Sequence, residues 1–134
     1  RIKDWQTEDD WSAIILEQQD SIIGLGILKR FRSEQATSGI VIADEYIHQG
    51  FGYLLQMILI AQARLLRIPR FHVKIVSDNL ASLRLHEKCG FLRTGIVPWD
   101  GYERMKEYLD ATEYDGKGKA EDRHIIEMTL KLDE

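Results

Sequence analysis

The stretch IVIADEYIHQGFGYLLQMILIAQARLLRI, from Ile40 to Ile68, combines a strand, a glycine turn and a long helix. It opens on an apolar run that is typical of a buried strand, and it passes two acids before reaching Gly50-Phe51-Gly52. The apolar helix that follows is stopped by Pro69. Because neither glycine carries a Cβ, the backbone of this turn can approach a bulky ligand closely. The first amides of the helix lack intrahelical acceptors, so the turn is suited to binding a phosphate group.

A second block with regular spacing follows the next predicted strand. It reads Asn79-x-x-Ser82-x-x-x-His86-x-x-x-Gly90-Phe91, and Gly90 is placed to end the helix that this block forms. With both blocks present, the chain resembles the GNAT superfamily of N-acetyltransferases over about residues 12 to 132. That family binds acetyl-CoA with Arg/Gln-x-x-Gly-x-Gly/Ala at a helix start, and a later segment reads Asn-x-x-Ala/Ser, then an aromatic residue, then Gly-Phe.

The order of the predicted elements is that of the GNAT fold from its second strand onward. A hairpin at 11–29 is followed by a strand at 39–45, a helix, a strand at 71–76, a helix and two strands at 91–99 and 124–132. The resemblance implies an α/β fold with a mixed, mostly antiparallel sheet, a central parallel strand pair and helices packed on it. Residues 1–134 are expected to form a single domain. Only residues 1–10 precede the hairpin, so we expect the family's first strand and two helices to be missing from an N-terminally truncated domain.

Composition excludes several classes of protein. The chain has 134 residues, enough for one domain with a substantial core, and its net charge of −4 argues against binding of nucleic acid. No apolar run is long enough to span a membrane, and the acid-rich start does not have the pattern of a signal peptide. The single cysteine, Cys89, cannot form an internal disulfide and is expected to pack in the core. We expect a cytoplasmic protein with neither nucleic-acid nor membrane partners.

The resemblance implies acetyl-CoA as co-substrate and no metal. The backbone at Ile42 and Ala43 would meet the pantetheine arm, and the amides of the turn would hold the pyrophosphate. These turn residues are Ile47, His48, Gln49, Gly50, Phe51, Gly52 and Tyr53. The apolar Ile47 stands where the family usually has Arg or Gln, and we expect the next two residues to replace that contact. The alternative for His48 is an exposed loop residue.

The polar residues of the second block have two interpretations each. The resemblance implies that Asn79 and Ser82 contact the cofactor, whereas the alternatives are a helix cap and an ordinary helix-surface residue. His86 is also expected at the cofactor and would protonate the CoA thiolate as it leaves, in a Leu-His-Glu-Lys setting like that of phosphinothricin-type acetyltransferases. Alternatively, His86 only hydrogen-bonds the sulfur or packs as a polar core residue.

A general base is needed because the attacking amine is protonated at pH 7. Some relatives carry a glutamate on the strand before the second helix, but Lys74 stands there. Glu45 is the candidate base, with Asp44 and Glu34 as further candidates, and the alternative for Glu45 is a surface acid at a strand end. The four histidines lack the spacing of metal ligands.

The functional expectation is an acetyl-CoA-dependent N-acetyltransferase that acts on a primary amine of a small molecule or protein. The alternative is a non-catalytic acyl-CoA-binding sensor or regulatory domain of a longer protein. Acidic residues gather between residues 103 and 122, which favours a cationic amine acceptor unless they form only a solvated loop. A homodimer is a further expectation.

Overall fold

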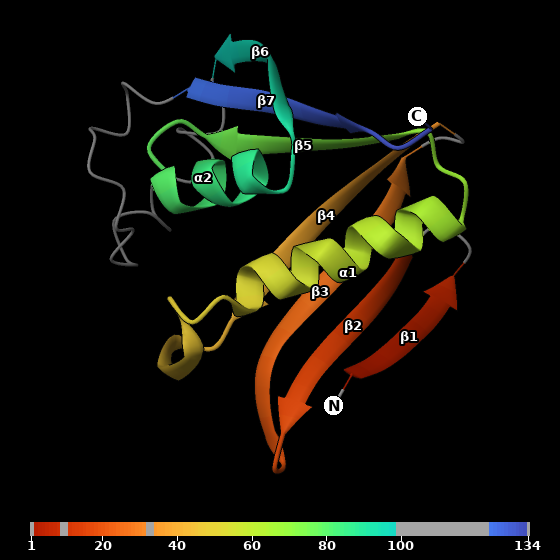
Figure 1. Cartoon of the computed structure of the whole chain (residues 1–134), viewed down its shortest axis with the longest axis vertical. Helices are drawn as coiled ribbons and strands as arrows, with labels where there is room; N and C mark the ends of the chain where they lie inside the picture. Colours follow the sequence, from red (N-terminus) through yellow and green to blue (C-terminus); the bar gives the residue numbers. More distant parts are fainter. Residues whose placement is uncertain (1, 9–10, 32–33, 99–123, 134) are drawn as a thin grey trace. The chain divides into compact units, whose positions relative to one another are not determined.

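The computed structural model describes residues 2–8, 11–31, 34–98 and 124–133. Within these ranges the strands follow the order β1-β2-β3-β4-β5-β7-β6 (Figure 1). The chain divides into two compact units, residues 1–73 with 129–134, and residues 74–128. The elements are β1 (Ile2–Glu8), β2 (Trp11–Gln18), β3 (Ser21–Phe31), β4 (Gln35–Ile42), the 3-10 helix η1 (Asp44–Tyr46), α1 (Phe51–Leu65), β5 (Arg70–Val76), α2 (Leu80–Lys88), β6 (Leu92–Pro98) and β7 (His124–Lys131).

The sheet of the first unit is antiparallel from β1 to β4. Ile14 of β2 pairs with Gly26 of β3, and Gly26 pairs in turn with Ile40 of β4. Strand β5 then joins β4 in parallel through Gln35 opposite Arg70 and Ala36 opposite Phe71. The expected mixed, mostly antiparallel sheet with a parallel strand pair is therefore confirmed.

Several expected boundaries differ from the structure. Helix α1 ends at Leu65, and Arg67 is left-handed with a φ of 57°, so the helix stops before Pro69 is reached. Ile2–Glu8 forms a strand that is antiparallel to β2, whereas from the sequence we expect the family's first strand to be missing. A strand at a sheet edge can be held by main-chain bonds to one neighbour, so it needs no strong side-chain pattern. Strand β4 was expected at residues 39–45 but spans Gln35–Ile42, because Asp44–Tyr46 turns into the 3-10 helix η1.

Helix α1 packs on the sheet of the first unit where β3 carries two glycines. A Cβ at Gly24 would lie 2.9 Å from the carbonyl oxygen of Val41 and 3.1 Å from Cδ1 of Leu55, and one at Gly26 would lie 3.3 Å from Cδ1 of Leu59. Figure 1 shows α1 lying along β3 and β4. The two glycines therefore let the helix approach the sheet closely, as expected for glycines inside a strand.

The second unit contains the end of β5, helix α2, β6 and most of β7. The end of β5 is tied to β7 because the amide of Ser77 donates to the carbonyl of His124 at 2.8 Å, and the amide of His124 donates to Oγ of Ser77 at 3.1 Å. Helix α2 ends as the sequence predicted, since Gly90 has a φ of 98° and the Phe91 amide donates to the carbonyl of His86 at 3.0 Å. The half-buried Cys89 lies at this end. None of the described helices has the length and apolar character that a membrane crossing requires.

Candidate cofactor site

The connection from β4 to α1 forms an exposed turn. The chain leaves the sheet at Ala43, whose amide donates to the carbonyl of Ile23 and whose carbonyl accepts from the amide of Tyr46, both at 2.8 Å. After η1 the backbone takes up two left-handed residues, His48 with a φ of 61° and Gly50 with a φ of 86°. Residues 47–50 are all exposed. This agrees with the exposed-loop interpretation of His48.

Gly50 is the N-cap residue of α1 and offers no side chain to the helix start. The first bond back along the helix runs from the amide of Leu54 to the carbonyl of Gly50 at 3.1 Å. A Cβ added to Gly50 would meet no protein atom within 4 Å, so the space beside the turn is open to a ligand. The amides at the start of a helix point outward along its axis and favour an anion.

Gln49 and Phe51 make contacts in this turn that the sequence did not reveal. Nε2 of Gln49 donates to the carbonyl of Glu45 at 3.2 Å, so this side chain is engaged within the protein. Of the two residues expected to replace the missing Arg or Gln contact, His48 is the better candidate. The ring of Phe51 meets that of Tyr46 edge to face, with centroids 6.0 Å apart. Aromatic residues on both sides of Gly50 are the signal that could have indicated this pair.

Strand β4 extends beyond the residues of its parallel ladder with β5. The parallel ladder pairs only Gln35 and Ala36 with β5 in the described residues, while β4 continues to Ile42. Because the amide of Ala43 points to β3, and directions alternate along an antiparallel ladder, Ile40 and Ile42 point their main-chain groups to the opposite edge. This geometry favours Ile42 as a main-chain contact for an extended ligand, whereas both main-chain groups of Ala43 are already bonded.

In the second unit, Asn79 caps helix α2. Its Oδ1 accepts from the amide of Ser82 at 3.2 Å, and its carbonyl accepts from the amide of Leu83 at 3.1 Å. The cap interpretation of Asn79 is therefore present in the structure. The side-chain oxygen is used in the cap, so a contact with a cofactor would come from the amide nitrogen of the same side chain.

His86 is buried on α2, one turn after Ser82. Its Nδ1 lies 2.7 Å from the carbonyl oxygen of Ser82 and 3.4 Å from Oγ of the same serine. The ring packs edge to face on Phe91, with centroids 5.0 Å apart and an interplanar angle of 82°. Since a carbonyl oxygen can only accept, Nδ1 carries the proton, and Nε2 is the acceptor nitrogen of the neutral ring.

Burial lowers the pKa of His86 below its ordinary value of 6.5, and the hydrogen bond to the Ser82 carbonyl opposes that shift in part. The imidazole is therefore mainly neutral at pH 7. A neutral ring with its proton on Nδ1 has none to give at Nε2. For His86 to act as an acid, the ring must first be protonated, and that step becomes easier as the pH falls.

The candidate bases lie on the surface. Asp44 and Glu45 are exposed on η1, and Glu34 forms an exposed ion pair with Arg70 at 3.2 Å. Glu45 belongs to the first unit and His86 to the second. Among the described residues, no group of three or more His, Cys, Asp or Glu side chains could hold a metal ion. The acidic residues between 103 and 122 lie outside the described residues.

A family comparison identifies the class of protein. The family model described as "Acetyltransferase (GNAT) domain" matches residues 1–92, which is more than half of the 134-residue chain. The chain therefore belongs to the GNAT acetyltransferases, and the resemblance seen in the sequence is confirmed. The general chemistry of this family is acetyl transfer. Among curated proteins, a sequence search finds no match.

Solved structures share the fold at low sequence identity. A Bacillus subtilis acetyltransferase in complex with CoA has a TM-score of 0.74 and 20% identity, over 92% of this chain and 78% of its own. A Salmonella typhimurium protein described as an acetyltransferase, solved with acetyl-CoA, has a TM-score of 0.73 and 22% identity, over 92% and 66%. The ribosomal-protein-S18-alanine N-acetyltransferase of Escherichia coli has a TM-score of 0.69 and 20% identity, over 94% and 72%. These likenesses establish the α/β fold of the chain.

Proposed function

We propose that this domain transfers an acetyl group from acetyl-CoA to a primary amine of a small molecule or protein. Membership of the GNAT acetyltransferases supports acetyl transfer, and similar structures were solved with CoA or acetyl-CoA. The observation that carries the proposal is the early end of the β4–β5 ladder, followed along the chain by the exposed glycine turn. An extended cofactor with a pyrophosphate needs both a strand edge and a helix start.

In this proposal the first unit holds the cofactor by its backbone. The main chain at Ile42 would bond the pantetheine arm, and the amides from His48 to Tyr53 would surround the pyrophosphate. The apolar Ile47 is 47% exposed and can offer only its main chain, so the anion would be bound mainly by peptide groups. From the second unit, the side-chain amide of Asn79 and the hydroxyl of Ser82 are the proposed polar contacts.

Acetyl-CoA would supply the activated thioester carbonyl. The amine must lose a proton before it attacks, and we assign that step to Glu45, directly or through water. Glu45 is exposed on η1, so water can reach its carboxylate. His86 would return a proton to the departing thiolate when its ring is charged. Because burial lowers the pKa of His86, this contribution grows as the pH falls.

A non-catalytic acyl-CoA sensor is the second candidate. It is favoured by Lys74, which is exposed on β5 where some relatives carry the glutamate base. The two candidates differ in turnover. We would incubate the protein with acetyl-CoA and a panel of amines, and measure release of free CoA as new thiol. Thiol release that depends on an amine supports the enzyme, whereas tight CoA binding without any release supports the sensor.

A substitution in the glycine turn tests the proposed position of the cofactor. Gly52 is the second residue of α1 and half-buried, and a valine there would project toward the proposed pyrophosphate position. Gly52→Val should weaken acetyl-CoA binding far more than it lowers the thermal midpoint of unfolding. Calorimetry that gives the wild-type affinity for a folded Gly52→Val protein would contradict the proposed position of the cofactor.

The charge of the amine acceptor and the oligomeric state of the protein are also proposals. The acidic residues between 103 and 122 favour a cationic amine, and screening by salt should then raise the Michaelis constant for the acceptor. A Michaelis constant that does not change with ionic strength would remove this steering effect. A homodimer in the cytoplasm remains a prediction, and sedimentation of the purified protein tests its oligomeric part.

A further inference from the structure

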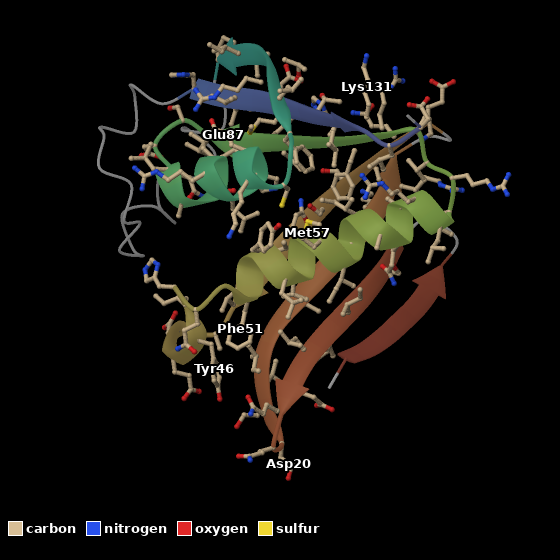
Figure 2. The ribbon with its side chains drawn as sticks, viewed as in Figure 1. Asp20, Tyr46, Phe51, Met57, Glu87 and Lys131 are labelled. Atoms are coloured by element: carbon tan, nitrogen blue, oxygen red, sulfur yellow. The ribbon has the colours of Figure 1, made fainter. Side chains whose placement is uncertain are left out.

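The turn between η1 and α1 is spanned by two contacts, which we call the turn clasp. In the first, Nε2 of Gln49 donates to the main-chain oxygen of Glu45 at 3.2 Å. In the second, the rings of Tyr46 and Phe51 meet edge to face, 6.0 Å apart and at 84°. Figure 2 shows Tyr46 and Phe51 beside each other at the start of α1. The turn clasp thus joins η1 both to the turn and to the first residue of the helix.

The turn has few other means of keeping its shape. Residues 47–50 are all exposed, so buried apolar packing does not fix them. His48 carries a side chain in the left-handed region, with a φ of 61°, and that conformation is unfavourable for a residue with a Cβ. A segment of this kind samples other conformations in water unless contacts at its two sides hold it.

We propose that the turn clasp positions the helix-start amides for the pyrophosphate of acetyl-CoA, with Tyr46, Gln49 and Phe51 as positioning residues. This inference rests on the proposed function. Ordering a loop on binding costs conformational entropy, and a loop that is already held in its bound shape spares the ligand that cost. Loosening the turn clasp should therefore weaken binding of the cofactor's phosphate end and leave the acetyl chemistry unchanged.

The first measurement is the affinity of the full chain for CoA by calorimetry. Gln49→Met removes the donor at nearly constant length, and Phe51→Leu removes the ring but keeps an apolar side chain. Each should weaken CoA binding by roughly two- to tenfold, the range expected for one aromatic pair or one hydrogen bond. The control is Leu65→Ala, which changes a side chain that is 83% exposed on the same helix. It should bind CoA as the wild type does.

The second measurement needs no ligand. Amide hydrogen exchange of the peptide covering residues 44–54 should be faster in Gln49→Met and Phe51→Leu than in the wild type and the Leu65→Ala control. The third compares acetyl-CoA with acetyl-pantetheine, which lacks the pyrophosphate. The loosened variants should lose kcat/KM for acetyl-CoA while kcat/KM for acetyl-pantetheine stays at the wild-type value.

The possible results separate this inference from the proposed function. If wild-type protein binds CoA and both loosened variants bind it equally well, the turn clasp does not position the site, and the proposed function stands. Unchanged hydrogen exchange in the loosened variants overturns the inference in the same way. If wild-type protein does not bind CoA, the proposed function fails, and the positioning role fails with it.

Discussion

Nδ1 of His86 lies 2.7 Å from the carbonyl oxygen of Ser82, one turn earlier on α2. This hydrogen bond fixes the tautomer of a buried histidine, since the acceptor is a carbonyl and the proton must lie on Nδ1. Nε2 is then the nitrogen at which the ring gains its second proton. The proton state of His86 therefore changes with pH, and two measurements can follow this change: the stability of the protein and its kcat.

The first prediction concerns stability against pH. Burial holds the pKa of folded His86 below 6.5, its ordinary value, so the unfolded chain takes up this proton first as the pH falls. The unfolded state then binds more protons than the folded state, and the contribution of His86 to stability is fully present above 6.5 and is lost below it. Urea unfolding from pH 7.5 to pH 5 should show a steeper loss in the wild type than in His86→Phe. Parallel pH profiles for the two proteins would contradict the assignment.

The second prediction concerns turnover. If His86 gives a proton to the leaving thiolate, His86→Phe should lower kcat by roughly a hundredfold, with the affinity for acetyl-CoA little changed. A tyrosine holds its proton throughout the neutral range, so His86→Tyr should keep much of the rate. The ratio of wild-type kcat to His86→Tyr kcat should therefore fall as the pH rises. Equal kcat values for the wild type and His86→Phe would remove His86 from the mechanism.

The third prediction separates the two roles of Asn79. Asn79→Ala removes the helix cap and should lower the free energy of unfolding by about 1 kcal/mol. Asn79→Ser keeps a capping oxygen and should retain most of that stability, but it lacks the side-chain amide. If the amide contacts the cofactor, both variants should bind CoA more weakly than the wild type. If Asn79→Ser binds CoA with the wild-type affinity, Asn79 only caps the helix and does not contact the cofactor.

The fourth prediction concerns the close approach of α1 to the sheet. Gly24→Ala would put a Cβ 2.7 Å from Cδ1 of Ile42 and 2.9 Å from a main-chain oxygen, whereas the nearest atom at Gly26 is a leucine methyl at 3.3 Å. Overpacking of this kind costs about 1–3 kcal/mol, and Gly24→Ala should lie near the top of that range. Gly26→Ala should cost clearly less, because a methyl can move and a main-chain oxygen cannot. Equal unfolding free energies for the two variants would argue against this packing.

The sequence was sufficient for most of the fold because its signals are local. The apolar run before Gly50 predicts β4, and Asn79 with Gly90 brackets α2 at the positions that the structure shows. The beginning of β4 and its end at Ile42 were misplaced, since the 3-10 turn at Asp44 has no strong pattern of its own. Strand β1 was missed because it is held by main-chain pairing with β2 and its sequence has no strong strand pattern.

The candidate site was predictable in its main-chain parts and less so in its side chains. The two glycines indicate a turn whose backbone can approach a phosphate closely, and this signal does not depend on how the rest of the chain packs. In contrast, the bond from Gln49 to Glu45 and the tautomer of His86 are each set by a main-chain carbonyl four residues earlier, and residue type alone does not indicate such a bond. The burial that lowers the pKa of His86 likewise has no signature in the spacing of residues along α2.

Strand β1 also bears on how the molecule behaves at high concentration. It pairs with the edge of β2 that is opposite β3, and the centre of β2 is the apolar run Ala13-Ile14-Ile15-Leu16. The sequence of β1 includes the charged residues Lys3, Asp4 and Glu8. Charged residues in a terminal strand discourage another chain from adding to a sheet. A shorter protein that starts at Trp11 would present β2 as a bare, apolar edge. Such a protein is expected to self-associate through strand addition, and β1 would then keep the protein soluble by covering the edge of β2.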